Sequence, residues 1–312
     1  MIKVLFVTPI PAEYRSRFTE IAGTEIEFVQ ASDVTDAQLM DADVVMGNLP
    51  MDRLAVCDHL QWVQLNSAGA NTYKDLAPSI QLTNASGAYG PAISEHMIGC
   101  VLMVMKNLAN YMEVQKNHDF TNLGSVNTLG MSKVLAVGMG DIGSSFAKKM
   151  HALGAEVYGV RRSVHDTPDY VKQMYTMDTM DEILGECDVV ALSLPETEET
   201  VHLFDYERLS KIKKGAILVN VGRGTAIVTD DLVRLQKEDH FSGICLDVTD
   251  PEPLPRNHPL WNMKHVYLTP HISGRFNAAV TFDRVLDIFE NNLRAFTEGR
   301  PLQNIVDKSI GY

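Results

Sequence analysis

Three side chains in the C-terminal half of the chain are of types that transfer protons and bind anions: Arg223, Glu252 and His271. His271 lies in a Pro-His-x-x-Gly turn, and an imidazole can donate or accept a proton near neutral pH. Glu252 would stabilise the imidazolium and orient the ring, while Arg223, which is always charged, would bind a carboxylate and polarise a carbonyl group. Each residue alone has a simpler explanation: His271 could be a hydrogen-bonded turn histidine, Glu252 a solvated side chain and Arg223 part of a surface ion pair. Together they suit the reduction of a 2-keto acid, which also needs a hydride donor.

A glycine-rich segment upstream could bind that donor. Gly138-Met139-Gly140-Asp141-Ile142-Gly143 has the G-x-G-x-x-G pattern and follows an apolar run, 134–137, that predicts a strand. The glycines would allow a tight turn and a close approach of the backbone to a pyrophosphate at the N-terminus of the next helix. A bare match is weak, since glycine-rich turns also pack helices on strands. The strand before it and the helix expected after it favour dinucleotide binding.

The end of the next expected strand, 156–160, bears on the choice of nicotinamide cofactor. NAD-binding units place an acidic residue there to bind the ribose hydroxyls, but this strand is followed by Arg161-Arg162-Ser163. Two guanidinium groups and a hydroxyl suit a 2′-phosphate, because arginine forms bidentate, charge-assisted bonds to phosphate. A solvated basic turn is the alternative. The sequence therefore predicts a preference for NADP (NADPH), with NAD still possible.

The elements that must position these residues form two series of short apolar strands alternating with helices. Strands are expected at 3–7, 25–30, 42–47, 62–66 and 81–84 in the first series, and at 133–138, 156–160, 188–194, 216–221, 243–247 and 266–269 in the second. One long apolar helix is expected from Pro91 to His118, and a final amphipathic helix from Phe276 to Phe296. Strands alternating with helices predict parallel sheets covered on both faces. A first domain that is interrupted by the second and completed by the last helix would explain this order.

The amino-acid composition limits which binding partners and which cellular compartment are expected for the protein. The 312 residues include 27 basic and 40 acidic side chains, a net charge of −13, without a run of lysine and arginine. Neither nucleic acid nor an anionic membrane surface is therefore expected as a partner. The four cysteines are widely spaced in apolar segments, and no zinc-type spacing of histidine and cysteine occurs. This predicts buried, reduced thiols in a cytoplasmic protein without a metal site. The apolar surface of the helix from Pro91 predicts a symmetric homodimer.

Motifs along most of the chain are similar, in order and spacing, to those of the D-isomer-specific 2-hydroxyacid dehydrogenase family. Besides the glycine-rich loop they occupy residues 194–200, 219–224, 246–255, 259–261 and 268–274 and, in the first series, 66–70 and 83–87. The resemblance implies an α/β protein with two doubly wound parallel-sheet domains. In it, a Rossmann-type dinucleotide-binding domain (99–273) is inserted into a flavodoxin-like substrate domain (1–98 and 274–312). It also implies an enzyme that reduces a small 2-keto acid to a D-2-hydroxy acid.

The same resemblance assigns further site residues. It places Asp247 near the nicotinamide carboxamide, and the backbone N–H groups of Ala68 and Gly69 on the substrate carboxylate. The other cofactor contacts that it implies are Pro195, Thr200, Val221, Gly222, Ser273 and Gly274. The substrate pocket is expected near Asn48, Leu49, Ser67 and Tyr89.

The chain departs from the family at one position. Where the family commonly has Asp, eighteen residues after Gly143 (161 − 143), this chain has Arg161. The departure bears on the cofactor and not on the reaction. Of the other functions on this scaffold, formate dehydrogenase is disfavoured because that branch has Gln where Glu252 stands. A dinucleotide-binding corepressor-like protein is the remaining alternative, and long disordered extensions would be expected of it.

Overall fold

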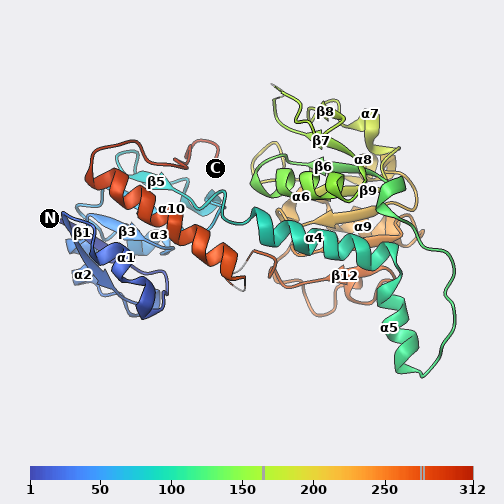
Figure 1. Cartoon of the computed structure of the whole chain (residues 1–312), viewed down its shortest axis with the longest axis horizontal. Coiled ribbons are helices and arrows are strands. Elements are labelled where there is room, and N and C mark those ends of the chain that lie inside the picture. The colour runs from blue at the N-terminus through green and yellow to red at the C-terminus, as the bar shows by residue number, and fades with distance from the viewer. Residues whose placement is uncertain (164–165, 275, 277, 312) are drawn as a thin grey trace. The chain divides into compact units, whose positions relative to one another are not determined.

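The computed structural model describes residues 1–163, 166–274, 276 and 278–311 of the chain. These residues form two compact units, the first of Met1–Tyr89 with Phe276–Tyr312 and the second of Gly90–Arg275. Each unit is built on one parallel sheet (Figure 1). The boundary expected after residue 98 falls inside helix α4 (Gly90–Met105), which lies as a whole in the second unit.

The first unit contains a sheet in the order β2-β1-β3-β4-β5, which is the flavodoxin-like order. Its strands are β1 (Ile2–Phe6), β2 (Thr24–Phe28), β3 (Val44–Met46), β4 (Trp62–Gln64) and β5 (Gln81–Thr83). Its helices are α1 (Ser16–Thr19), α2 (Asp36–Asp41), α3 (Met51–Leu54) and α10 (Ala279–Thr297). Successive side chains of a strand point to opposite faces. Leu5 therefore enters the core on one face, while Phe6 packs against Phe289 of α10 on the other, with ring centroids 5.7 Å apart.

The second unit contains a sheet in the order β12-β11-β10-β9-β6-β7-β8. Its strands are β6 (Lys133–Val137), β7 (Glu156–Val160), β8 (Gln173–Tyr175), β9 (Val189–Leu192), β10 (Ile217–Asn220), β11 (Gly243–Leu246) and β12 (Val266–Leu268). Counted within the unit from its other edge, this is the Rossmann order 3-2-1-4-5-6 with one more strand. Both sheets confirm the fold class predicted from the sequence.

Helices cover both faces of the second sheet. Helices α4 and α6 lie side by side on one face, and α7, α8 and α9 pack on the other (Figure 1). The bounds are α5 (Leu108–Lys116), α6 (Asp141–Ala152), α7 (Asp181–Leu184), α8 (Tyr206–Lys211) and α9 (Thr229–Gln236). Short 3-10 helices occur at Ala12–Tyr14, Ala31–Asp33, Asn71–Tyr73, Leu129–Met131, Gly224–Ala226 and Pro259–Asn262.

Three expectations about these elements are corrected. The single helix expected from Pro91 to His118 is divided into α4 and α5, because Asn107 between them has φ of +57°, a left-handed conformation that asparagine tolerates. The final helix begins at Ala279 rather than at Phe276. Strand β8 was missed, because an edge strand of three residues that pairs only with β7 needs no long apolar run.

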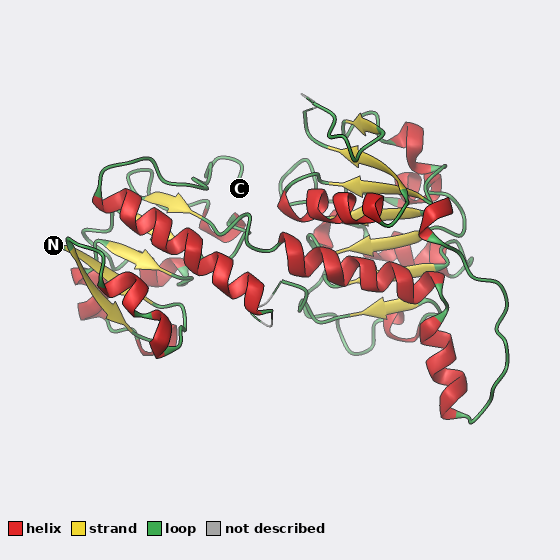
Figure 2. Cartoon of the chain, in the orientation of Figure 1, coloured by secondary structure: helices red, strands yellow, loops and turns green. Residues whose placement is uncertain are grey.

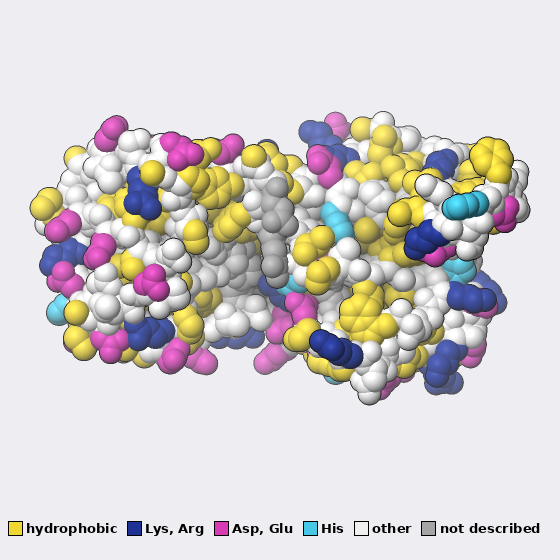
Figure 3. All heavy atoms as spheres, turned by 90° about the horizontal axis from the view of Figure 1, so that it is seen from below, with side chains coloured by type: hydrophobic (Ala, Val, Ile, Leu, Met, Phe, Trp, Pro, Cys, Tyr) yellow, Lys and Arg dark blue, Asp and Glu magenta, His cyan; other side chains and the backbone are white. Residues whose placement is uncertain are grey.

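The described residues include no helix that is both long enough and apolar enough to cross a membrane. On the face of the molecule shown in Figure 3, lysine and arginine side chains are scattered among acidic ones and do not gather into one basic patch.

Candidate active site

The strands of the second sheet end level with one another, so the loops that follow them lie at one edge. The register pairs their last residues in the chain of neighbours Val160–Val137–Leu192–Asn220–Leu246–Leu268. Figure 2 shows the arrowheads of this sheet pointing the same way. The cofactor and catalytic candidates of this unit all lie in these loops or in the first turn of α6, at the carboxyl edge where doubly wound sheets bind ligands.

The glycine-rich loop after β6 has a shape that fits a pyrophosphate. Gly138 has φ of +94°, and a Cβ on Gly143 would lie 1.9 Å from Gly138 O, so both positions exclude other residues. Gly140, in contrast, has nothing within 4 Å of the place where a Cβ would be, and α6 begins after it without a side-chain cap. The open side at Gly140 and the first N–H groups of α6 together suit a phosphate group.

The two other candidates in this loop lie differently. Asp141 Oδ2 accepts a hydrogen bond of 2.8 Å from Gly90 N, at the start of α4. The Asp141 carboxylate thus holds α4 against the loop. Ile142 is half-buried.

His271 and Glu252 come together at the same edge. Glu252 Oε1 lies 2.7 Å from His271 Nδ1, and each side chain is less than half exposed. Because Glu252 follows β11 and His271 follows β12, the contact joins two neighbouring loops. His271 has φ of +50°, and its N–H donates to Asp247 O at 2.8 Å. Such a left-handed residue persists only where the surroundings hold it in place.

Asp247 supplies much of that support. It is 2% exposed, and its carboxylate accepts hydrogen bonds from Thr269 Oγ1 (2.6 Å), Ile272 N (3.0 Å), Ser273 N (3.0 Å) and Ser273 Oγ (2.5 Å). Burial alone would raise the pKa of Asp247, but these bonds outweigh it and hold the pKa below its usual value. Four bonds occupy the lone pairs of a carboxylate. The described hydrogen bonds of the Asp247 carboxylate are therefore with the turn that carries His271, and its contact with a nicotinamide stays a prediction.

Arg223 follows β10, two strands away from His271. Strands lie about 4.8 Å apart, so the two strand ends are roughly 10 Å apart. The Asn220 side chain donates to Arg223 O at 2.9 Å, and Arg223 Nη1 donates to Gly222 O at 2.8 Å. Among the residues that the structure describes, no acidic side chain forms an ion pair with this half-buried guanidinium. The group is thus suited to an anionic ligand.

Close packing draws the neighbouring loops together. A Cβ on Gly222 would lie 2.5 Å from Leu194 O, in the loop after β9. Thr200 Oγ1 closes that loop by donating to Pro195 O at 2.7 Å. Val221 is 6% exposed, and Gly274 is half-buried. The cofactor contacts of these residues and of Ser273 remain predictions.

Arg161, after β7, has an acidic neighbour. Arg161 Nη1 lies 3.1 Å from Asp166 Oδ1, and the Asp166 side chain is 71% exposed. Arg162 and Ser163 are exposed. Glu156, at the other end of the strand, pairs with Lys172 at 2.6 Å. Because exposed ion pairs contribute little, a phosphate could replace Asp166 on the Arg161 guanidinium.

In the first unit the expected substrate residues follow β4. Ser67 Oγ accepts from Asn48 Nδ2 at 3.1 Å and donates to Gly69 O at 2.8 Å, while Asn84 Nδ2 donates to Ala68 O at 2.8 Å. Within the described hydrogen bonds, the N–H groups of Ala68 and Gly69 have no acceptor. The loop is therefore held through its carbonyl groups and leaves two donors for an anion.

Residues 98–273 match the protein family described as D-isomer specific 2-hydroxyacid dehydrogenase, NAD binding domain. The chain belongs to this family. The match confirms the family and the class of enzyme predicted from the motifs, an NAD(P)-dependent D-2-hydroxyacid dehydrogenase.

Three proteins illustrate how similar this dehydrogenase is to known members. A D-isomer specific 2-hydroxyacid dehydrogenase family protein from Aeromonas salmonicida is 31% identical, with a TM-score of 0.89 over 98% of this chain and 99% of that chain. The NADPH-dependent glyoxylate/hydroxypyruvate reductase from Sinorhizobium meliloti, solved with NADP and sulfate, is 25% identical, with a TM-score of 0.86 over 100% of both chains. Glyoxylate reductase from Thermofilum pendens is 29% identical over 287 residues, which are 89% of this chain and 80% of that protein.

Sequence reasoning missed several positioning residues of this dehydrogenase. Asn220 donates to Arg223 O, Thr269 in the turn of His271 donates to Asp247 Oδ1, and Ser193 Oγ donates to Gly138 O at 2.8 Å. Asn220 and Thr269 lie inside motifs that the sequence analysis used, so their polar side chains at strand ends were a usable signal. Leu49 and Tyr89 are 1% and 7% exposed, and the substrate pocket expected near them stays a prediction.

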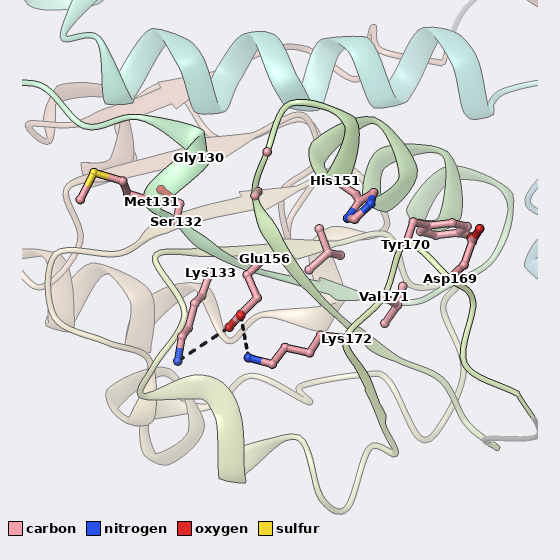
Figure 4. A pocket seen from close by; sticks show the side chains of 13 residues that line it. Gly130, Met131, Ser132, Lys133, His151, Glu156, Asp169, Tyr170, Val171 and Lys172 are labelled. Carbon is pink, nitrogen blue, oxygen red and sulfur yellow. Dashed lines mark hydrogen bonds and ion pairs between the residues drawn. The ribbon is translucent and has the colours of Figure 1, made fainter.

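A hollow of about 560 Å³ lies elsewhere on the second unit, at the amino ends of β6 and β7 (Figure 4). Glu156 lies between Lys133 and Lys172 there, with ion-pair distances of 4.0 and 2.6 Å. Both lysines are thus already paired. The hollow is also at the edge opposite to the loops of the candidate site, so we assign it no part in the reaction.

Proposed function

We propose that this dehydrogenase reduces a short 2-keto acid to the D-2-hydroxy acid with NADPH. The observation that carries the proposal is the His271–Glu252 pair, which lies at the same sheet edge as Arg223 and a loop that fits a pyrophosphate. When bound, the nicotinamide supplies the hydride. The chain's own residues must then bind the acid, polarise its carbonyl group and deliver a proton.

Each of these tasks has a candidate group. Arg223 would bind the substrate and stabilise negative charge on the carbonyl oxygen, since its guanidinium is charged at all relevant pH values. With Nδ1 held by Glu252, Nε2 of His271 is the nitrogen that would donate a proton to that oxygen. Glu252 would stabilise the imidazolium and orient the ring. The N–H groups of Ala68 and Gly69 would bind the substrate carboxylate. The compartment that we propose for this reaction is the cytoplasm.

The relatives support a small substrate, because the S. meliloti protein is named for glyoxylate and hydroxypyruvate and the T. pendens protein for glyoxylate. The test is oxidation of NADPH, followed by its absorbance, with a panel from glyoxylate, hydroxypyruvate and pyruvate to branched and aromatic 2-keto acids. Turnover with the short acids is expected. Binding of NADPH without turnover of any of them would contradict the proposal and favour the corepressor-like alternative.

We predict that kcat/KM with NADPH exceeds that with NADH by at least about tenfold. Hydrogen bonds to charged groups contribute about 1.5–3 kcal/mol, and the Arg161–Asp166 pair is exposed enough to be displaced. Arg161→Asp should remove or reverse the preference, whereas Asp166→Asn should increase it. Lys237→Asp makes the same charge change on an exposed residue of the same unit and should leave the ratio of the two values unchanged. Equal kcat/KM values for the two cofactors in the wild type would refute the prediction.

We also propose a homodimer, formed through α5 and the loop after it. Helix α5 has no buried residue and projects from the second unit (Figure 1). Four apolar side chains of the helix and the loop are exposed: Leu108 50%, Met112 62%, Phe120 105% and Val126 50%. Figure 3 views this unit from the side to which α5 projects, and apolar side chains are spread over that face. Apolar patches of this kind mark interaction surfaces.

Sedimentation at micromolar concentration should therefore show two chains, and the double variant Met112→Glu, Phe120→Glu should shift the protein toward one. Met40→Glu, at an apolar residue of the first unit that is 51% exposed, is the matched control and should leave the mass unchanged. A wild-type monomer would refute the proposed dimer.

A further inference from the structure

Helix α4 contacts β11 at two points, which follow one another in antiparallel order along the two elements. Val104 fills the space at Gly243, where an added Cβ would lie 2.6 Å from both methyl carbons of the valine. One helical turn earlier, and two strand residues later, Cys245 Sγ lies 4.0 Å from Cys100 O. Four helical residues rise about 6 Å and two strand residues about 6.6 Å, so the two contacts are spaced almost equally on the helix and on the strand.

Cys100 also has a histidine neighbour on its own helix. His96 Nε2 lies 3.6 Å from Cys100 Sγ, since residues four apart share one face of a helix. Cys245 is 2% exposed, but Cys100 and His96 are only half-buried. The expectation that all the cysteines are buried is therefore wrong for Cys100, and also for Cys57.

The surroundings of Cys100 favour its thiolate. The neighbouring Cys245 thiol lowers the pKa of Cys100 and the contact with His96 adds to this, while burial and the charge of Asp247 oppose it. The bond with Cys100 raises the pKa of His96. The neighbouring Cys100 thiol together with burial raises the pKa of Cys245. A thiolate beside an imidazolium, with a neutral thiol next to it, is the arrangement of an attacking and a resolving cysteine.

The described His, Cys, Asp and Glu side chains form no group of three that could hold a metal ion.

We propose that Cys100 and Cys245 are a thiol pair that reacts with hydroperoxides to form a disulfide between α4 and β11. The Cys100 thiolate attacks one peroxide oxygen and breaks the O–O bond, which gives a sulfenic acid, and the second oxygen leaves as water or an alcohol with a proton from His96. Cys245 then loses its proton, attacks the sulfenyl sulfur and displaces the hydroxyl group as water. The two electrons lost by the sulfur atoms reduce the peroxide, so two thiols and hydrogen peroxide give one disulfide and two waters.

The test uses the full-length, reduced protein carrying Cys57→Ser, which keeps Cys100, Cys187 and Cys245. After hydrogen peroxide treatment, the protein is denatured, alkylated with N-ethylmaleimide and weighed intact. One alkyl group is expected instead of three, together with a cross-linked peptide pair that contains Cys100 and Cys245 and separates in dithiothreitol. Three alkyl groups, or a disulfide between other cysteines or between two chains, would overturn the proposal.

Single variants on this background assign the roles. Cys245→Ser should accumulate a sulfenic acid on Cys100 that dimedone traps, and Cys100→Ser should leave Cys245 reduced. His96→Gln should slow oxidation of Cys100 about tenfold or more at pH 7 and much less at pH 9.5, where thiols ionise without help. His151→Gln, on α6, is the control and should react at the wild-type rate. Oxidation of Cys245 in Cys100→Ser, or equal rates for His96→Gln and wild type at pH 7, would overturn the assigned roles. None of these measurements depends on keto-acid reduction.

Discussion

Replacing His271 with alanine should lower kcat for 2-keto acid reduction by about 10²- to 10⁴-fold, the usual contribution of a positioned acid–base group. The proton donor is lost, whereas the cofactor loop after β6 is not touched. Binding of NADPH, measured by the quenching of protein fluorescence, should therefore change little. The rate comparison uses the short keto acid that the wild type reduces best.

Two further variants make this result specific. Glu252→Gln should have a smaller effect than His271→Ala, because the amide oxygen can still accept a hydrogen bond from His271 Nδ1. His151→Ala, at an exposed histidine of α6, should retain the wild-type kcat. If His271→Ala keeps more than about a tenth of the wild-type kcat, the proton must come from another group and the assignment fails.

Arg223→Gln should lower kcat/KM by about 10²- to 10³-fold, comparable to the loss of a donor that stabilises an oxyanion. The guanidinium has no acidic partner among the described residues. Its removal therefore breaks no ion pair among them. Arg223→Lys should recover part of the loss through charge alone. A compact ammonium cannot form the two parallel bonds of the planar guanidinium, so both KM and kcat should remain impaired.

The matched control is Arg256→Gln, which removes an exposed guanidinium from a loop of the same unit. It should leave both constants near the wild-type values. Were Arg223→Gln to raise KM without any change in kcat, Arg223 would bind the acid equally in the ground state and the transition state, and its proposed stabilisation of the oxyanion would be wrong.

The candidate site was largely predictable because its residues follow apolar strands directly. The glycine-rich loop, Arg223, Asp247 and His271 each come just after such a run, and parallel strands that end level bring those positions to one edge. Residue type then limits the chemistry of each position. For the same reason the edge strand β8, which has only three residues, was the part of the sheet that the pattern missed.

From the sequence by itself followed the alternation of strands and helices in parallel sheets, and the loops that carry the candidate proton donor, the candidate anion-binding arginine and the candidate phosphate site, since these depend on local periodicity and residue type. Only the tertiary structure decided which distant side chains meet. Asp247 proved to be bonded to the turn of His271, and Cys100 lies against Cys245, 145 residues away, because α4 contacts β11. The packing of a helix on a strand depends on how side chains of both elements fit together, as Val104 fills the space at Gly243. A local sequence pattern contains only one of the two elements and therefore does not predict this fit.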